Sequence, residues 1–282
     1  MYRSLQPGAV GIRISLNEGL ELAAQYGFEG LHVNINEVIR IGPEKVKEQF
    51  EAKGLIPSAW GLPVDVRGDD ATFEKGLNGL PKWADVAMQL GCLRTSTYIL
   101  SFSDDLPFKE NYCRHQNRLR AIGEVLSDRD IRLGLEFLGP KTLRDGHRYA
   151  FIHTMDGMLE LCDDIGTGNM GLLLDAWHWY TSHGTVEDLK RLRDEHIVDV
   201  HVNDAPKGIP IDEQIDNVRC LPGETGVIDI ASFLRTLHKI GYTGPVMAEP
   251  FSKKIQGLPP HEAAHLTGEA LTKIWNIAGL DI

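Results

Sequence analysis

Short apolar runs alternate with longer amphipathic stretches along the chain, and this alternation predicts strands and helices in turn. The runs are rich in Val, Ile and Leu, whereas the stretches between them repeat apolar residues every three or four positions, as a helix with one buried face does. The predicted strands lie in AVGIRIS from Ala9, GLHVNI from Gly30, LIPSAWGLPV from Leu55, LRTSTYIL from Leu93, IRLGLEFLG from Ile131, GLLLDAWHW from Gly171, IVDVHVNDA from Ile197 and GPVMAEPF from Gly244.

The stretches between these runs carry helix boundary signals. Pro43 suits the first turn of a helix in PEKVKEQFEAKG, and Thr185 suits the cap of a helix in TVEDLKRLRDEH. Two further helices are predicted in GLELAAQYG and DIASFLRTLHKIGY. Glycine ends helices because it adopts a left-handed backbone without strain, and the expected stops are Gly27, Gly54, Gly91 and Gly241.

A strand followed by a helix, repeated eight times, predicts a parallel sheet that closes into a single (β/α)8 TIM barrel. An open doubly wound sheet is the alternative, but it needs edge strands, and the first and last runs are as apolar as the others. No linker, charge block or low-complexity tract divides residues 1–282, so we expect one domain. The irregular segments after the fourth, fifth and seventh runs follow the carboxyl ends of strands, where barrels place their active sites.

Composition narrows the functional classes. The chain has 40 acidic residues against 29 Lys and Arg, a net charge of −11, which argues against binding to nucleic acid. It has no signal-peptide pattern and no apolar run of roughly 18 residues, so we expect a cytoplasmic protein without a membrane segment. The four cysteines are scattered without CxxC spacing and are expected to be reduced.

The last four predicted strands each end with a potential metal ligand. These residues are Glu136, Asp175, His201 and Glu249, at intervals of about one strand and helix. A single acid at a strand end commonly caps a helix, but four such residues at equivalent positions interrupt apolar strands, where an unpaired carboxylate is costly to bury. Three carboxylates and one imidazole suit one divalent ion. The oxygen majority favours Mn²⁺ or Mg²⁺, with Co²⁺ and Zn²⁺ as alternatives.

This set of residues resembles that of the xylose isomerase-like TIM barrels, which include sugar phosphate isomerases and epimerases such as tagatose and psicose 3-epimerases, with endonuclease IV as a relative. The strand rhythm extends the resemblance over the whole chain, and its most specific part runs from Glu136 to Glu249. It implies that the four residues bind one metal ion and that His178, in an Asp-x-x-His pattern, contacts substrate. Family epimerases usually have Arg six residues after the metal-binding His, where this chain has Lys207.

The resemblance also implies a reaction: a metal-dependent isomerase or epimerase acting on a small keto sugar or related polyol. The ion acts as Lewis acid and stabilises the enediolate formed when a neighbouring C–H proton is removed. Glu136 and Glu249 are the implied catalytic residues, one withdrawing the proton and the other returning it for epimerisation; the spacing permits this arrangement. A homo-oligomer is left open.

Further substrate contacts are expected from aromatic and basic side chains near the predicted mouth. Trp60 and Trp177 suit the C–H faces of a sugar, although core packing is the ordinary role of such rings. Lys207 and Arg219 lie in the long seventh loop and suit an anionic substituent, although most loop cations are simply solvated. His178 has the alternative of packing between its tryptophan neighbours.

Three competing functions follow from the same residues. A lyase of the same superfamily, either a dehydratase or an enzyme that cleaves C-glycosides or 3-keto-glycosides, begins with the same proton removal, and the ligands do not separate the two. An endonuclease IV-like enzyme binds three zinc ions and needs further histidines, which SAWGLP and STYIL lack. A non-catalytic sugar-binding barrel is expected to have lost metal ligands, and here the set is intact.

Overall fold

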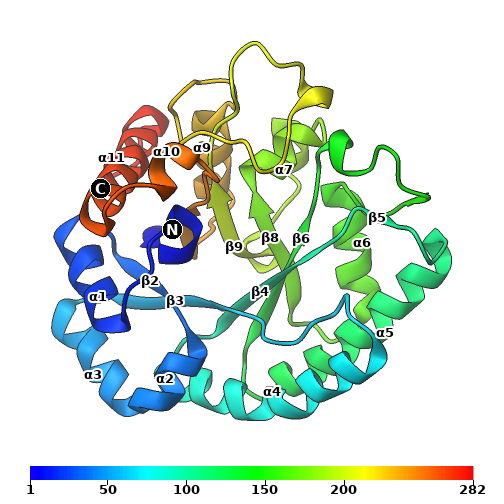
Figure 1. Ribbon diagram of the computed structural model, residues 1–282, viewed down its shortest axis with the longest axis horizontal. Coiled ribbons are helices and arrows are strands. Elements are labelled where there is room, and N and C mark those ends of the chain that lie inside the picture. Colours follow the sequence, from blue (N-terminus) through cyan, green and yellow to red (C-terminus); the bar gives the residue numbers. More distant parts are fainter. Residues whose placement is uncertain (282) are drawn as a thin grey trace.

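Eight parallel strands close on themselves into a barrel with helices outside it (Figure 1). The structure is a computed structural model, and it describes residues 1–281. Tyr2 pairs with Pro245 and Ser4 with Gly30, so the first strand bridges the last and the second and closes the ring. The predicted (β/α)8 TIM barrel is therefore confirmed. Its strands, in order around the barrel, are β1 (Tyr2–Leu5), β2 (Gly30–Val33), β3 (Ile56–Gly61), β4 (Arg94–Ile99), β6 (Arg132–Phe137), β8 (Met170–Asp175), β9 (Ile197–Val202) and β10 (Pro245–Ala248).

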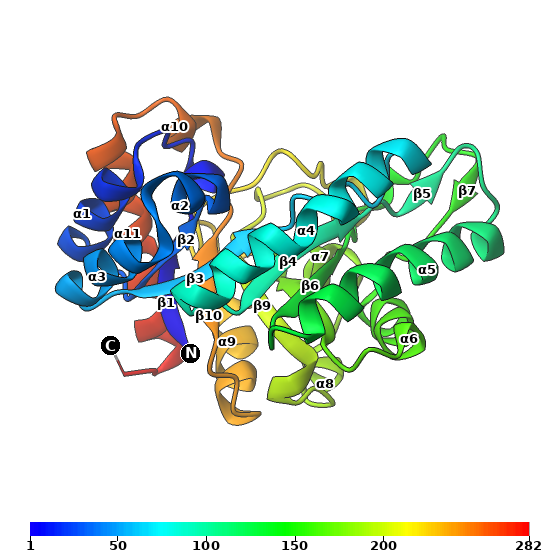
Figure 2. The same ribbon diagram turned by 90° about the horizontal axis from the view of Figure 1, so that it is seen from below.

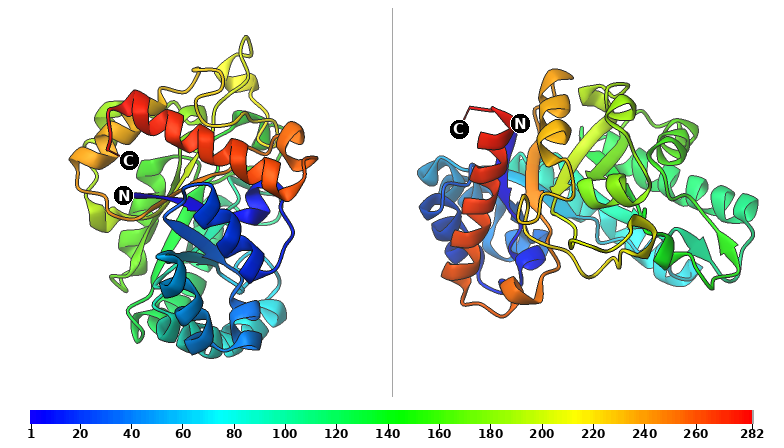
Figure 3. Two further views of the ribbon diagram at one scale, coloured as in Figure 1. Left: turned by 90° about the vertical axis from the view of Figure 1, so that its left-hand side faces the viewer. Right: turned by 90° about the horizontal axis from the view of Figure 1, so that it is seen from above.

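The helices surround the strands, and the last helix lies near the first strand, so that the two ends of the chain are close together (Figure 3). Among the described helices, none combines the length and the apolar run that crossing a bilayer requires. The α-helices are α1 (Leu16–Gln25), α2 (Ile35–Ile41), α3 (Pro43–Lys53), α4 (Asp70–Leu90), α5 (Phe108–Ser127), α6 (Met155–Ile165), α7 (Ala176–Thr181), α8 (Val186–Leu189), α9 (Ile230–Lys239), α10 (Lys253–Gln256) and α11 (Pro260–Ala278), and the short 3-10 helices are η1 (Pro7–Val10), η2 (Lys141–Leu143), η3 (Asp194–His196) and η4 (Ile211–Glu213).

The boundary signals in the sequence act as predicted. Pro43 is the first residue of α3, and Gly54 and Gly91 end α3 and α4 in the left-handed conformation. Thr185 caps α8, and its hydroxyl accepts the backbone N–H of Asp188. α8 is shorter than the periodicity predicts, because the chain turns after Leu189 to bury Leu192 and enter η3.

The predicted first strand is wrong. The barrel begins earlier, at Tyr2, and the segment from Ala9 to Ser15 forms the end of η1 and the following loop. Pro7 starts η1 because it lacks an N–H group and has a fixed φ, and Gly11 ends it with φ 77°. The alternating apolar residues of this loop line a cavity instead of a sheet. The other seven strand predictions are confirmed, although AWHW after Asp175 is helix α7.

A two-stranded antiparallel arm, which the sequence pattern did not predict, extends from the barrel. β5 (Phe102–Ser103) pairs with β7 (Tyr149–Ala150), and the two strands belong to the irregular segments that follow β4 and β6. The arm projects beyond the barrel beside the start of α5 (Figure 2). The Phe102 ring stacks on His147 with 3.4 Å between ring centroids, which ties the two segments together.

Candidate metal centre

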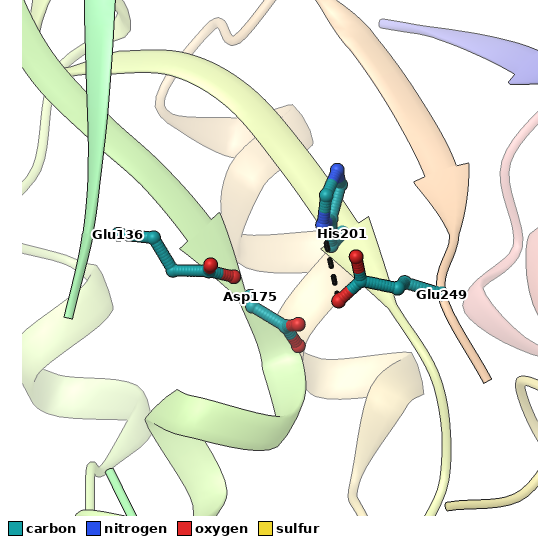
Figure 4. A group of neighbouring side chains, drawn as sticks. All are labelled: Glu136, Asp175, His201 and Glu249. Atoms are coloured by element: carbon teal, nitrogen blue, oxygen red, sulfur yellow. Dashed lines mark ion pairs between the residues drawn. The ribbon is translucent and has the colours of Figure 1, made fainter. Parts of the chain in front are cut away.

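Four ionisable side chains meet at the carboxyl ends of the last four barrel strands. Glu136 lies in β6, Asp175 ends β8, His201 lies in β9, and Glu249 directly follows β10. Asp175 pairs with His201 in the sheet, and the Glu249 N–H donates to the Val202 carbonyl at 3.0 Å, so the strand register fixes their relative heights. Each residue offers one ligand atom, and these atoms all lie within 4.8 Å of one another (Figure 4).

The donor atoms of this cluster suit a divalent ion. Glu136 Oε1 is buried and has no hydrogen-bond partner among the described residues, and His201 Nδ1, also buried, makes only a 3.5 Å ion pair with Glu249 Oε2 (Figure 4). Leaving a buried polar atom unpaired is costly, and a bound cation supplies the missing interaction. Carboxylate oxygens with one imidazole nitrogen form a mixed donor set that Mn²⁺, Mg²⁺, Co²⁺ and Zn²⁺ all accept.

The close approach of these groups shifts their pKa values in different directions. Burial, followed by the charges of Glu249 and Asp175, raises the pKa of Glu136 well above its ordinary value. Burial also disfavours the charged form of Glu249, but His201 and Arg219 outweigh it and lower its pKa. Burial disfavours imidazolium at His201, yet the carboxylates, chiefly that of Glu249, raise its pKa to about 10. In the absence of a metal ion, the cluster therefore holds protons and a cation of its own.

Arg219, predicted as a substrate contact in the seventh loop, brings a permanent positive charge to the cluster. Its side chain is buried, and Nη1 donates to Asp175 Oδ2 at 2.8 Å and to Glu249 Oε2 at 3.0 Å. Nη2 donates to Asp216 Oδ1 at 2.8 Å, which fixes the guanidinium plane. The guanidinium carbon lies 4.6 Å from the ring centroid of Phe251, a residue with φ 37°. Arg219 thus contacts the ligand carboxylates directly.

His178 also reaches the cluster, as its position after Asp175 predicted. The Gly139 N–H donates to His178 Nδ1 at 3.1 Å, so the proton of the neutral ring is on Nε2. Burial lowers the pKa of His178 to about 3, which keeps the ring neutral. Nε2 lies 3.3 Å from Arg219 Nη2 and 3.7 Å from Glu136 Oε1, so this nitrogen faces the site.

Two residues that support the cluster were missed in the sequence. Asn203 Nδ2 donates to Asp175 Oδ1 at 2.9 Å and to the Glu249 carbonyl at 3.3 Å, which joins two neighbouring ligands. Asp204 is fully buried and accepts backbone N–H groups from four consecutive residues, Thr225 to Ile228. It thereby anchors the end of the loop that carries Arg219. Both residues lie in the segment HVND, which begins with the His201 ligand, and two polar residues at the end of an apolar strand were the signal that sequence reasoning overlooked.

The remaining predicted substrate contacts lie in different surroundings. Trp60 is fully buried, and its Nε1 donates to the Cys92 carbonyl at 3.1 Å, so the ring packs in the core. Trp177 is also fully buried, but its Nε1 has no partner among the described residues and its ring centroid lies 5.3 Å from the Arg219 guanidinium carbon. Lys207 is exposed at a turn of the long loop.

Comparison with known proteins identifies similar sequences. Residues 20–273 match the family model described as xylose isomerase-like TIM barrel. The chain is 27% identical over 145 residues to an inosose isomerase of Bacillus subtilis, covering 51% of this chain and 49% of that protein. It is 30% identical over 263 residues to a 3-dehydroshikimate dehydratase of Pseudomonas aeruginosa, covering 92% of this chain but 39% of the dehydratase. The chain thus spans half or less of the length of these two relatives.

Solved structures give the same fold over almost the whole chain. A xylose isomerase domain protein from Alicyclobacillus acidocaldarius superposes with a TM-score of 0.88 at 31% identity, covering 99% of both chains. A structure of the IolI protein with a bound zinc atom superposes with a TM-score of 0.81 at 19% identity, covering 97% of this chain and 98% of that one.

Proposed function

The chain belongs to the xylose isomerase-like TIM barrel family, and we propose that residues 1–282 act as one catalytic domain, a divalent-metal-dependent isomerase or epimerase of a keto sugar or related polyol. One observation carries the proposal. Glu136 and Glu249 enter the cluster from opposite sides, with all four ligand atoms within 4.8 Å of one another (Figure 4). Two carboxylates so placed suit proton removal from one face of a substrate and proton return to the other.

The proposed cofactor is one divalent ion held by Glu136, Asp175, His201 and Glu249. When bound, the ion would supply Lewis-acid stabilisation of the negative charge that develops on a substrate carbonyl. The oxygen-rich donor set favours Mn²⁺, and the zinc atom bound in the IolI structure, which has the same fold, supports a divalent ion as cofactor.

The residues of the chain have separate roles in the proposed reaction. One glutamate removes the proton beside the carbonyl; return by the other to the opposite face gives epimerisation, whereas transfer by a single glutamate between adjacent carbons gives isomerisation. His178 donates its Nε2 proton in a hydrogen bond to a substrate oxygen. Arg219 orients Asp175 and Glu249 and offers the substrate a positive charge. The inosose isomerase of Bacillus subtilis supports this choice.

A lyase is the second candidate, and the geometry of His178 favours it. A dehydratase removes the same proton and then expels a neighbouring hydroxyl group, which leaves more readily when an acid protonates it. Glu136, whose raised pKa lets it hold a proton, is placed to supply that proton while Glu249 removes the C–H proton, and the neutral His178, with Nε2 3.7 Å from Glu136 Oε1, donates a hydrogen bond to the departing oxygen. The similarity to the 3-dehydroshikimate dehydratase extends over 92% of this chain and supports the same alternative.

Exchange of substrate protons with deuterated water tests the proposal. Purified protein is loaded with Mg²⁺ and incubated with keto sugars and keto acids, and exchange beside the carbonyl is followed by NMR. Glu136→Gln and Glu249→Gln are each expected to slow exchange by about 10²- to 10⁴-fold, whereas Glu44→Gln on the exposed face of α3 leaves it unchanged. New alkene signals indicate the lyase. Exchange that persists in both glutamate variants contradicts the proposal.

A further inference from the structure

A cavity of about 440 Å³ opens at the carboxyl ends of β1, β2 and β3, and β1 pairs with β10, the strand that Glu249 directly follows. It lies on the same face of the barrel as the cluster, but on strands that contribute no metal ligand. Its apolar wall suits the carbon chain of a ligand and includes Ile12, Ile14, Leu31, Val33, Ile35 and Pro63. Its polar side chains are Arg13, Ser15, His32, Asn34, Asn36 and Glu37.

His32 connects this cavity with the cluster. It lies on β2 in the cavity wall, and it is close enough to His201 for the two rings to interact electrostatically. Burial and then His201 lower the pKa of His32 to about 4, so the ring is neutral near pH 7. A neutral imidazole has one N–H donor and one acceptor, and neither is used by another described residue. His32 is therefore free to contact a hydroxyl group of a ligand that extends from the cluster into the cavity.

The two asparagines of the cavity present donors rather than acceptors. Asn34 Oδ1 accepts the backbone N–H of Asn36 at 3.0 Å, and Asn36 Oδ1 accepts the Trp83 indole N–H at 2.9 Å. Because both donors require an oxygen, the orientation of each amide is fixed. The –NH₂ group of each side chain remains without a partner in the described part of the chain. A ligand that meets these groups must bring hydrogen-bond acceptors.

The charged side chains of the cavity also favour a ligand that carries hydrogen-bond acceptors. The one acidic side chain in its wall, Glu37, accepts from the Leu16 N–H at 3.1 Å and pairs with Arg40 at 3.2 Å. Arg13 is exposed to solvent and forms no ion pair or hydrogen bond with any residue between 1 and 281, so its guanidinium group is free to meet an anionic ligand. The chain as a whole carries a net charge of −11 and repels anions. A local excess of hydrogen-bond donors and positive charge in this cavity therefore favours an anionic ligand there.

We propose that this cavity is the distal subsite of the enzyme and that it binds a carboxylate or phosphate at the end of the substrate remote from the reacting carbonyl. Arg13 pairs with the anion, and His32 binds a hydroxyl group between the anion and the carbonyl. This inference rests on the proposed function for the position of the carbonyl, and it adds that the substrate is an anionic keto sugar or polyol.

Three probes that share the configuration of D-fructose test the subsite: D-fructose, D-fructose 6-phosphate and D-fructuronate. All have a hydroxymethyl ketone at one end, and they differ in whether the other end is neutral, a phosphate or a carboxylate. Proton exchange gives KM and kcat, and titration calorimetry measures binding in parallel. The variants are Arg13→Gln, His32→Gln and, as a charge-matched control, Lys47→Gln on the exposed face of α3.

The natural sequence is expected to bind at least one anionic probe about tenfold more tightly than D-fructose. Arg13→Gln removes that difference through KM, Lys47→Gln keeps it, and His32→Gln weakens all three probes by a similar factor. Of the two anionic probes, the one that loses more affinity in Arg13→Gln shows whether the subsite binds a carboxylate or a phosphate. Equal binding of all probes, or an anion preference that persists in Arg13→Gln, overturns the inference. Anion binding that depends on Arg13 without any proton exchange contradicts the proposed reaction and leaves the subsite standing.

Discussion

The two sides of the barrel mouth differ in charge and in how tightly they are built. One side has three carboxylates and an imidazole at the ends of β6, β8, β9 and β10. These side chains are almost fully buried, and Arg219 hydrogen-bonds to two of them. On the other side, the ends of β1, β2 and β3 surround an open cavity with one unpaired cation and a set of neutral donors. The strands are the same kind of element on both sides, so the difference comes from the residues at their carboxyl ends.

Two histidines show what this difference does. Carboxylates, chiefly that of Glu249, raise the pKa of His201 to about 10, whereas burial lowers the pKa of His32 to about 4. One side of the mouth thus concentrates negative charge, which suits the cation binding and proton transfer that we propose there. The other side presents donors to whatever part of a substrate does not react. In the proposed enzyme, chemistry and selectivity therefore lie on different strands and are open to separate mutation.

The largest difference between the two sides is expected in the stability of two Gly→Ala variants near strand ends. A Cβ at Gly139, after β6, would collide with the His178 carbonyl oxygen, whereas a Cβ at Gly61, at the end of β3, has nothing within 4 Å. Gly139→Ala must displace α7 together with Asp175 and His178, and we expect a loss of about 3 kcal/mol in the free energy of unfolding. Gly61→Ala is expected to change it by less than about 0.5 kcal/mol.

Urea unfolding of both variants measures these free energies. Proton exchange measured on the folded fraction of Gly139→Ala adds a functional readout, because a displaced His178 loses its orientation toward Glu136. Equal stability of the two alanine variants would contradict the difference in packing that separates the two sides.

The second difference concerns metal binding. An ion that binds only the folded state at a concentration about 100 times its Kd stabilises it by about 2.7 kcal/mol. We expect Mn²⁺ at such a concentration to stabilise the metal-free protein by that free energy, seen as a rise in its melting temperature, and Asp175→Asn to abolish the rise. Glu37→Gln removes an acid from the cavity side and keeps the rise. Differential scanning calorimetry with and without EDTA measures all three proteins, and a rise retained in Asp175→Asn would place the ion elsewhere.

The two sides also differ in how much of them the sequence predicted. Glu136, Asp175, His201 and Glu249 were visible because each interrupts an apolar run at the end of a strand, and the barrel register brings such positions together. The cavity was not visible, because its wall combines η1, the loop after it, and the starts of α2 and the β3 loop. The regular alternation of AVGIRIS favoured a strand, but Pro7 and Gly11 decided the local backbone.

Side chains from loops were the hardest to place. Arg219 was predicted as a substrate contact, and its burial against Asp175 and Glu249 depends on a loop whose path Asp204 determines through four backbone N–H groups. No periodicity describes such a loop. Trp60 and Trp177 look alike in the sequence, and only their partners in the folded chain distinguish them.

A smaller difference appears in the dependence of stability on pH. Because the pKa of His32 is lowered from 6.5 to about 4, the folded state binds fewer protons than the unfolded state between these values. The contribution of His32 to stability is therefore full above about pH 6.5 and is lost as the pH falls toward 4. The protein is expected to lose unfolding free energy between pH 7 and pH 4.5. After allowance for the partial exposure of His32, we expect His32→Gln to make this loss smaller by about 2 kcal/mol.

Urea unfolding at pH 7 and pH 4.5 in EDTA measures this reduction, and NMR titration of the His32 ring gives its pKa directly. His265, exposed on α11, is the matched control, and His265→Gln is expected to leave the pH dependence unchanged. A His32 ring that titrates near 6.5 would remove the electrostatic contrast between the two sides of the mouth.

The smallest difference separates the two buried tryptophans, Trp60 on β3 and Trp177 on α7. Replacement by Phe removes similar ring volume at both positions, but only Trp60 loses a hydrogen bond, to the Cys92 carbonyl. We therefore expect Trp60→Phe to cost about 1 kcal/mol more in unfolding free energy than Trp177→Phe. Trp177 lies against Arg219, so its variant is expected to change KM, whereas Trp60→Phe keeps KM unchanged. Urea unfolding and substrate titration separate these outcomes, and a change in KM only for Trp60→Phe would reverse the assignment of the two rings.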